Sequence, residues 1–297
     1  MRAGRAFRVV TGLLVLVLFA ACAFLHMSHT PSARDIDTGV WKPAAAQPNP
    51  ADVPPPAAEP EATQTPEPEA TPEPTQTPEP TLDPNSPAGR AAALGLPAPP
   101  EIDIESWEYI LVNSTHEIGS DFAPPEIVKV GAQGCPQDSR IAEALEAFAD
   151  GCKAEGLPVY LSSGYRSYSE QQANFNRKLN EGYSREAAAK IVAVPGTSEH
   201  QTGLCCDITD IYRNPKDPAV LSKTDTFLWL EAHCAEYGFI LRFPNGEIAI
   251  TGIMYEPWHF RYVGVEAATY IMENELTLEE FVALYTGEEV PGAEETA

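Results

Sequence analysis

Two segments of the chain carry side chains whose types and spacing are typical of a metal centre. The first segment contains His200 and Asp207, and the second, four residues long, begins at Glu256 and ends at His259. Two imidazoles and one carboxylate suit Zn²⁺, and a catalytic zinc keeps its fourth position open for water. Glu256 lies three residues before His259, so it can address that water as a general base without ligating the metal.

Residue types alone leave a structural role open, because a His–Asp pair seven residues apart is more often structural than metal binding. Gly196 and Gly203 allow tight turns that would bring His200 and Asp207 to one point. The sequence has no His-Glu-x-x-His, which removes the commonest metalloprotease pattern. A serine hydrolase is disfavoured too, because the residues around Ser198 do not form a Gly-x-Ser-x-Gly nucleophile elbow.

The elements that would position these residues belong to one α+β domain, expected from residue 101 to residue 286. Helical periodicity and capping predict helices over 140–155, 169–180, 184–192, 226–237 and 276–285. Runs of β-branched and aromatic residues predict strands over 107–113, 159–163, 205–211, 239–243 and 247–251, with a last strand closing at Tyr262. A Pro-Asn-Gly turn is expected to join the strands at 239–243 and 247–251.

Several ordered blocks resemble a known family. Ser198-x-His200-x-x-Gly203-x-x-x-Asp207, followed by Glu256-x-x-His259, resembles the signature of the LAS metallopeptidases, which include VanY-type D-alanyl-D-alanine carboxypeptidases. Blocks at 163–168, 237–244 and 256–264 extend the resemblance over nearly the whole domain. The resemblance implies a LAS/hedgehog-like fold: a small, mostly antiparallel sheet flanked by helices, with the zinc site at the sheet.

The resemblance also implies a role for each of seven residues: Zn²⁺ ligands His200, Asp207 and His259, catalytic base Glu256, and peptide-contacting Arg166, Gln171 and Ser198. Arg166 would steady the developing oxyanion or the terminal carboxylate, which suits a planar group that stays charged. The chain departs from the family at two positions. Many members have Ala where Cys205 stands and Tyr where Phe243 stands.

The resemblance implies hydrolysis of a C-terminal D-alanine from peptidoglycan stem peptides, as a D,D- or an L,D-carboxypeptidase, by a monomer. Two alternatives stay open. An endolysin-like peptidoglycan endopeptidase shares the same metal motif, and a non-catalytic cell-wall-binding module shares the fold. The intact Glu256 argues against the binding module, which has no need of a base at that spacing.

The net charge of the chain indicates which partners to exclude, and its N-terminal segment indicates where in the cell the protein lies. The net charge of -24 argues against a nucleic-acid partner, since phosphates would be repelled. Arg2, Arg5 and Arg8 precede an apolar run over 9–25, which is typical of a targeting segment. Residues 1–25 are therefore expected to be a signal anchor, or a lipoprotein signal with Cys22 as the lipidated residue. Either would hold the rest of the chain at the outer face of the cell membrane.

The regions on either side of the domain have biased compositions. Residues 26–100 are rich in Pro, Glu, Thr and Ala, and we expect a disordered spacer there. Residues 287–297 form an acidic tail. An extracellular location permits disulfides, but spacing leaves open the pairing of the domain's five cysteines, Cys135, Cys152, Cys205, Cys206 and Cys234. A zinc site built from cysteines is disfavoured because paired Cys-x-x-Cys spacing is absent.

Overall fold

The computed structural model describes residues 82–212 and 216–292 of the chain. The expected membrane segment, 1–25, and most of the expected spacer, 26–100, lie outside the described residues. Among the residues that are described, no helix combines the length and the apolar character needed to cross a membrane.

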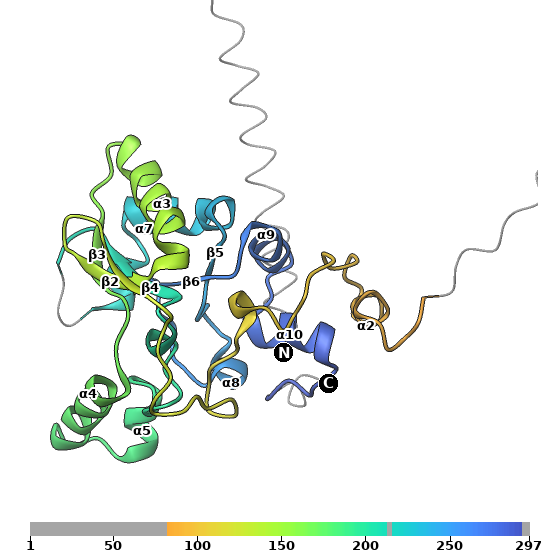
Figure 1. Ribbon diagram of the computed structural model, residues 1–297, viewed down its shortest axis with the longest axis horizontal. Coiled ribbons are helices and arrows are strands. Elements are labelled where there is room, and N and C mark those ends of the chain that lie inside the picture. Colours follow the sequence, from red (N-terminus) through yellow and green to blue (C-terminus); the bar gives the residue numbers. More distant parts are fainter. Residues whose placement is uncertain (1–81, 213–215, 293–297) are drawn as a thin grey trace, which may run out of the picture. The chain divides into compact units, whose positions relative to one another are not determined.

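A four-stranded antiparallel sheet with the order β3-β4-β6-β5 lies at the centre of the fold (Figure 1). A separate antiparallel pair, β1-β2, lies beside β3. The strands are β1 (Ile127–Val130), β2 (Cys135–Asp138), β3 (Tyr160–Ser163), β4 (Cys205–Thr209), β5 (Phe239–Leu241) and β6 (His259–Tyr262). The expected α+β architecture with small antiparallel sheets is confirmed.

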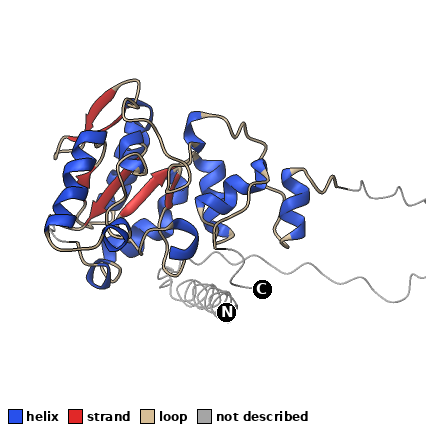
Figure 2. Ribbon diagram, turned by 90° about the horizontal axis from the view of Figure 1, so that it is seen from below, coloured by secondary structure: helices blue, strands red, loops and turns tan. Residues whose placement is uncertain are grey.

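Helices surround the strands, as Figure 2 shows. The α-helices are α2 (Pro87–Ala93), α3 (Ala142–Ala154), α4 (Tyr168–Asn180), α5 (Arg185–Ala189), α6 (Pro218–Leu221), α7 (Asp225–His233), α8 (Ile248–Thr251), α9 (Val265–Glu273) and α10 (Leu278–Thr286). Short 3₁₀ turns are η1 (Trp107–Tyr109), η2 (Ser139–Ile141), η3 (Glu199–Thr202) and η4 (Cys234–Tyr237). The five helices expected from the sequence are all present, most of them shorter than expected.

The larger apolar core lies between helix α3 and the sheet. Leu145, Phe148, Ala149 and Cys152 are the buried residues of α3, and their spacing of three and four residues places them on one helix face. The ring of Phe148 packs against aromatic rings from η4, α7, β5 and β6. This packing fixes the back of the sheet, so that β4 and β6 present a rigid surface to the opposite side.

A second core lies among α2, α9 and α10. Ala91 of α2 is fully buried together with Ile271 and Phe281. The Arg90 guanidinium donates to the carbonyl oxygens of Leu284 and Tyr285, both at 2.7 Å. The ordered domain therefore begins earlier than the expected boundary at residue 101, because α2 is needed to cover α10.

Two expected strands are wrong. Residues 107–113 form the 3₁₀ turn η1 and a loop, and Trp107 stacks on Tyr262 with ring centroids 6.1 Å apart instead of joining a ladder. Residues 248–251 form helix α8, which ends at Gly252 with φ 73°. The alternation over 247–251 is too short to separate a helical turn from a strand. The β1-β2 pair and α9 were not anticipated.

The described cysteines are free thiols and all are buried. Strand β4 separates the two adjacent ones. Cys206 faces the larger core, where its sulfur lies 4.0 Å from that of Cys135, while Cys205 lies on the same face of the strand as Asp207. Cys234 is fully buried and packs as a small apolar residue.

The packing around Phe148 predicts a large loss of stability on truncation. Phe148→Ala should lower the free energy of unfolding by about 3–5 kcal/mol, through lost burial and the cavity left behind. Urea unfolding of the full-length protein measures this change. The matched control, Leu228→Ala, removes an exposed side chain of α7 and should stay within about 0.5 kcal/mol of the parent. Equal effects of the two substitutions would contradict this account of the core.

Candidate metal centre

Pairing between two central strands positions two of the expected ligands. Asp207 of β4 lies directly opposite His259 of β6 in the antiparallel register. Side chains on paired residues point to the same face of a sheet, so the carboxylate and the imidazole meet without help from a loop. The third expected ligand, His200, lies on η3. Gly203 ends that turn with φ 68°, which returns the chain into β4 at a conformation that favours glycine.

The three expected ligands converge on one carboxylate oxygen. Oδ1 of Asp207 lies 3.5 Å from Nε2 of His200 and 3.2 Å from Nδ1 of His259. The two imidazole rings meet edge to face with centroids 5.0 Å apart. All three side chains are almost fully buried.

Each imidazole is oriented by a hydrogen bond at its other nitrogen. Nδ1 of His200 donates to the carbonyl oxygen of Gly164 at 2.7 Å, and Nε2 of His259 donates to Glu199 at 3.3 Å. A ring that donates through one nitrogen presents the lone pair of the other. Both histidines therefore direct a lone pair toward Asp207, which is the arrangement of a metal site with its supporting shell.

Gly164 is required for this arrangement. A Cβ atom at this position would lie 2.1 Å from the carbonyl oxygen of Pro136 and 2.3 Å from the amide of Gln137. Only glycine allows the backbone to pass this close to β2. This passage places the carbonyl oxygen of Gly164 within hydrogen-bond distance of Nδ1 of His200.

The buried polar atoms of the site fit a bound cation. Within the described residues, Oδ1 of Asp207 and Nδ1 of His259 are buried and have no hydrogen-bond partner. Such a pair is costly unless something between them accepts both lone pairs. Burial alone would raise the pKa of Asp207, but the positive charge of Lys216 lowers it well below its ordinary value. The carboxylate is therefore ionised, and the oxygen and nitrogen donors match the preferences of Zn²⁺.

Lys216 contacts the second oxygen of Asp207 and was not anticipated from the sequence. Its ammonium group pairs with Oδ2 and lies 5.5 Å from the ring centre of Trp258. One oxygen of Asp207 thus faces the histidines while the other is held by a lysine. No pattern in the sequence links position 216 to position 207.

Glu256 lies at the edge of this group. Oε2 of Glu256 is 3.6 Å from Nδ1 of His259, and the side chain remains 18% exposed to the pocket. Burial raises the pKa of Glu256 to about 7, although the nearby His259 opposes the increase. The carboxylate can therefore exchange a proton near neutral pH, while its exposure leaves it within reach of a molecule in the pocket.

A buried ion network behind His259 is the main feature that sequence reasoning missed. Oε1 of Glu199 accepts from Arg242 at 2.7 Å and from Arg261 at 2.8 Å, and Arg242 also pairs with Glu279 of α10 at 2.6 Å. Burial alone would raise the pKa of Glu199, but the two guanidinium groups lower it well below its ordinary value. Glu199 is therefore a fixed anion that holds the Nε2 proton of His259.

The remaining expected residues line the same pocket, which has a volume of about 660 Å³. Nη1 of Arg166 donates to Gln171 at 2.5 Å and Nη2 donates to Ser163 at 3.1 Å. The amide nitrogen of Gln171 in turn donates to the carbonyl oxygen of Ala193 at 2.5 Å. Ser198 is buried in the pocket wall immediately before η3. The structure thus brings together all seven residues singled out in the sequence.

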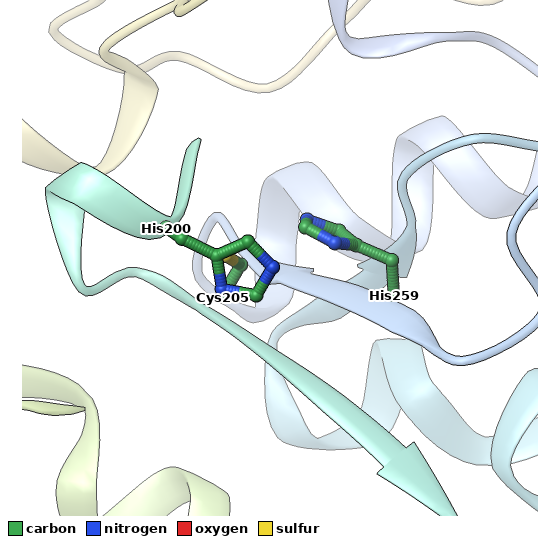
Figure 3. A group of neighbouring side chains, drawn as sticks. All are labelled: His200, Cys205 and His259. Atoms are coloured by element: carbon green, nitrogen blue, oxygen red, sulfur yellow. The ribbon is translucent and has the colours of Figure 1, made fainter. Parts of the chain in front are cut away.

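Cys205 lies beside the two histidines, as Figure 3 shows. Its sulfur and one nitrogen of each of His200 and His259 all lie within 4.8 Å of one another. Asp207, Glu256 and His259 form a second group that meets the same distance limit. Cys205 was noted in the sequence only as a departure from the family, so its place beside the histidines is new.

Comparisons with known proteins agree with this geometry. The family VanY, D-alanyl-D-alanine carboxypeptidase, matches residues 137–265, which contain all seven site residues. A D-alanyl-D-alanine carboxypeptidase of Enterococcus faecalis (strain ATCC 700802 / V583) is 38% identical over 188 residues, covering 61% of this chain and 67% of the relative.

Two solved structures are also similar to this chain. The LdcB LD-carboxypeptidase is 33% identical with a TM-score of 0.55, covering 63% of this chain and 94% of its own. A variant of the vancomycin-resistance D,D-pentapeptidase VanY from a VanB-type resistance cassette, in complex with Zn(II), is 36% identical with a TM-score of 0.51. That match covers 60% of this chain and 99% of the other. From these similarities, the chain belongs to the VanY family of D-alanyl-D-alanine carboxypeptidases.

Proposed function

We propose that this protein removes the C-terminal D-alanine from peptidoglycan stem peptides by zinc-dependent hydrolysis. The observation that carries the proposal is the convergence of two imidazole lone pairs on the buried, ionised Asp207, with the carboxylate of Glu256 beside them. His200, Asp207 and His259 would hold Zn²⁺. When bound there, the ion supplies Lewis acidity to the scissile carbonyl and to the attacking water.

Glu256 is the proposed general base. Its carboxylate accepts a proton from the attacking water and then donates that proton to the leaving amine of D-alanine. Its side chain is partly exposed to the pocket beside His259, which leaves it within reach of the groups that exchange the proton. The part of the pocket around Arg166 then has to hold the peptide so that the scissile bond lies beside this carboxylate.

Arg166 is the proposed contact for the negative charge of the substrate. Gln171 and Ser163 hold its guanidinium from two sides, so little rotamer freedom is lost on binding. A held guanidinium suits a terminal carboxylate or an oxyanion. Because similar structures include both an LD-carboxypeptidase and a D,D-pentapeptidase, the proposed substrates are a pentapeptide ending in D-Ala-D-Ala and a tetrapeptide ending in an L,D-bond.

Glu199 is a positioning residue in this proposal. It fixes the tautomer of His259 through the Nε2 hydrogen bond. All seven site residues line one pocket of the domain.

Substitution of the proposed base should separate metal binding from catalysis. Glu256→Gln should lower D-alanine release by about 10²–10⁴-fold, because the amide cannot accept the proton of water, while zinc binding is retained. The assay incubates the full-length protein with synthetic penta- and tetrapeptide stems and measures free D-alanine, and chelation should abolish release.

The matched control is Glu236→Gln, which changes an exposed glutamate and should leave the rate unchanged. Full activity of Glu256→Gln, or release that survives chelation, would sink the proposed mechanism. Cleavage within the stem instead of at its end would indicate an endopeptidase. No cleavage of either stem by the zinc-loaded protein would indicate a binding module.

The positioning role of Glu199 can be separated from its structural role. Glu199→Gln and Glu279→Gln each remove one negative charge from the same buried network, and both should destabilise the fold. Only Glu199 contacts His259, so only Glu199→Gln should weaken zinc affinity, by about 10–100-fold. Competition with a chelating indicator measures the affinity. Equal zinc affinities in the two variants would show that the network acts on stability alone.

We also propose that the protein is held at the outer face of the cell membrane by residues 1–25. The arginines before the apolar run support this orientation. The full-length protein should sediment with membranes when expressed in a bacterial host. Cys22→Ser should release it only if a lipid on Cys22 is the attachment, and should leave it membrane-bound if the apolar run is a signal anchor. Recovery of the unmodified protein in the soluble fraction would refute membrane attachment.

A further inference from the structure

Cys205 places a soft donor against the two histidines of the metal centre. Its sulfur and one nitrogen of each of His200 and His259 all lie within 4.8 Å of one another. This spacing is short enough for one ion to lie between the three atoms after small rotations. The exposed fractions of Cys205, His200 and His259 are 0%, 7% and 2%. The sulfur is therefore inside the protein and beside the histidines (Figure 3).

The fold gives the two adjacent cysteines different environments. Side chains alternate across a strand, so Cys205 shares a face of β4 with Asp207, and Cys206 points to the other face. Cys206 lies 4.0 Å from Cys135 in the apolar core. Cys206 is thus a matched buried thiol, one residue away, that has no access to the histidines.

We propose that Cys205 is a metal ligand, and that Cys205, His200 and His259 form a sulfur-containing donor set for thiophilic divalent ions. On binding, the thiol loses its proton to solvent and a metal–sulfur bond forms, with no change of oxidation state. The set overlaps the oxygen-rich group of Asp207, Glu256 and His259 through His259. It also shares both histidines with the proposed Zn²⁺ ligands His200, Asp207 and His259. Thiolate ligands select softer ions, and carboxylates select harder ones.

This inference rests on the metal centre of the proposed function, but it does not depend on hydrolysis. The test uses the full-length protein, stripped of metal and loaded with one equivalent of Co²⁺ or Cd²⁺. A thiolate ligand produces a sulfur-to-metal charge-transfer band in the ultraviolet, which nitrogen and oxygen ligands do not. The parent protein should show this band. Cys205→Ser should lose it, and Cys206→Ser should keep it.

Two further variants guard against misfolding of the serine variant. Cys205→Ala keeps a small apolar side chain and should also lose the band, with a circular dichroism spectrum like that of the parent. Asp207→Asn should keep the band, because Asp207 is outside the sulfur set. Cd²⁺ affinity should fall in Cys205→Ala by roughly tenfold or more relative to Zn²⁺ affinity, a change that corresponds to about 1.4 kcal/mol.

A metal-loaded parent protein without the band would overturn the inference, and so would a band of equal strength in Cys205→Ala. D-alanine release by a protein that lacks the band would leave the proposed function intact and refute only the sulfur ligand. A band in a protein that releases no D-alanine would support the sulfur ligand and contradict the proposed function.

Discussion

The pairing of Glu199 with Arg242 and Arg261 is the constraint on which the metal centre depends. Burying a carboxylate carries a large desolvation cost. Removing one partner of a buried ion pair leaves the other charge uncompensated, which costs more stability than replacing the whole pair by apolar residues. Here one carboxylate oxygen accepts from both arginines, and the other accepts from His259. The network therefore links η3, β6 and the chain after β5 at one point, and a metal ligand is part of it.

Further contacts within the chain fix the positions of the three proposed ligands. The strand register sets Asp207 against His259, and the backbone of Gly164 sets the ring of His200. Hydrogen bonds at the far nitrogens leave the near lone pairs aimed at one carboxylate oxygen. A site prepared in this way loses little freedom when it binds its ligand. Lys216 holds the second oxygen of that carboxylate.

Residue types and spacing alone leave the roles of His200, Asp207 and His259 open, and the family resemblance is what implies them as ligands. The structure brings the three side chains together. Helix α3 is recognisable from its apolar period. Glu199 is different. Next to a histidine it looks like an ordinary exposed residue, and its burial depends on arginines 43 and 62 positions away. Whether 247–251 becomes a strand or α8 likewise depends on a neighbouring strand, which is a tertiary property that no five-residue window contains.

The contact between α2 and α10 has a mechanical consequence. Arg90 ties the first described helix to the carbonyl oxygens at the end of the last one, and the hydroxyls of Tyr270 and Tyr285 bond the backbone at Pro97 and Pro100. A pulling force on the chain before α2 would therefore act first on these contacts of α2, and of the loop that follows it, with α9 and α10. Helix α10 also carries Glu279, which pairs with Arg242 of the network behind His259, so a force on α10 is transmitted to the support of the metal centre.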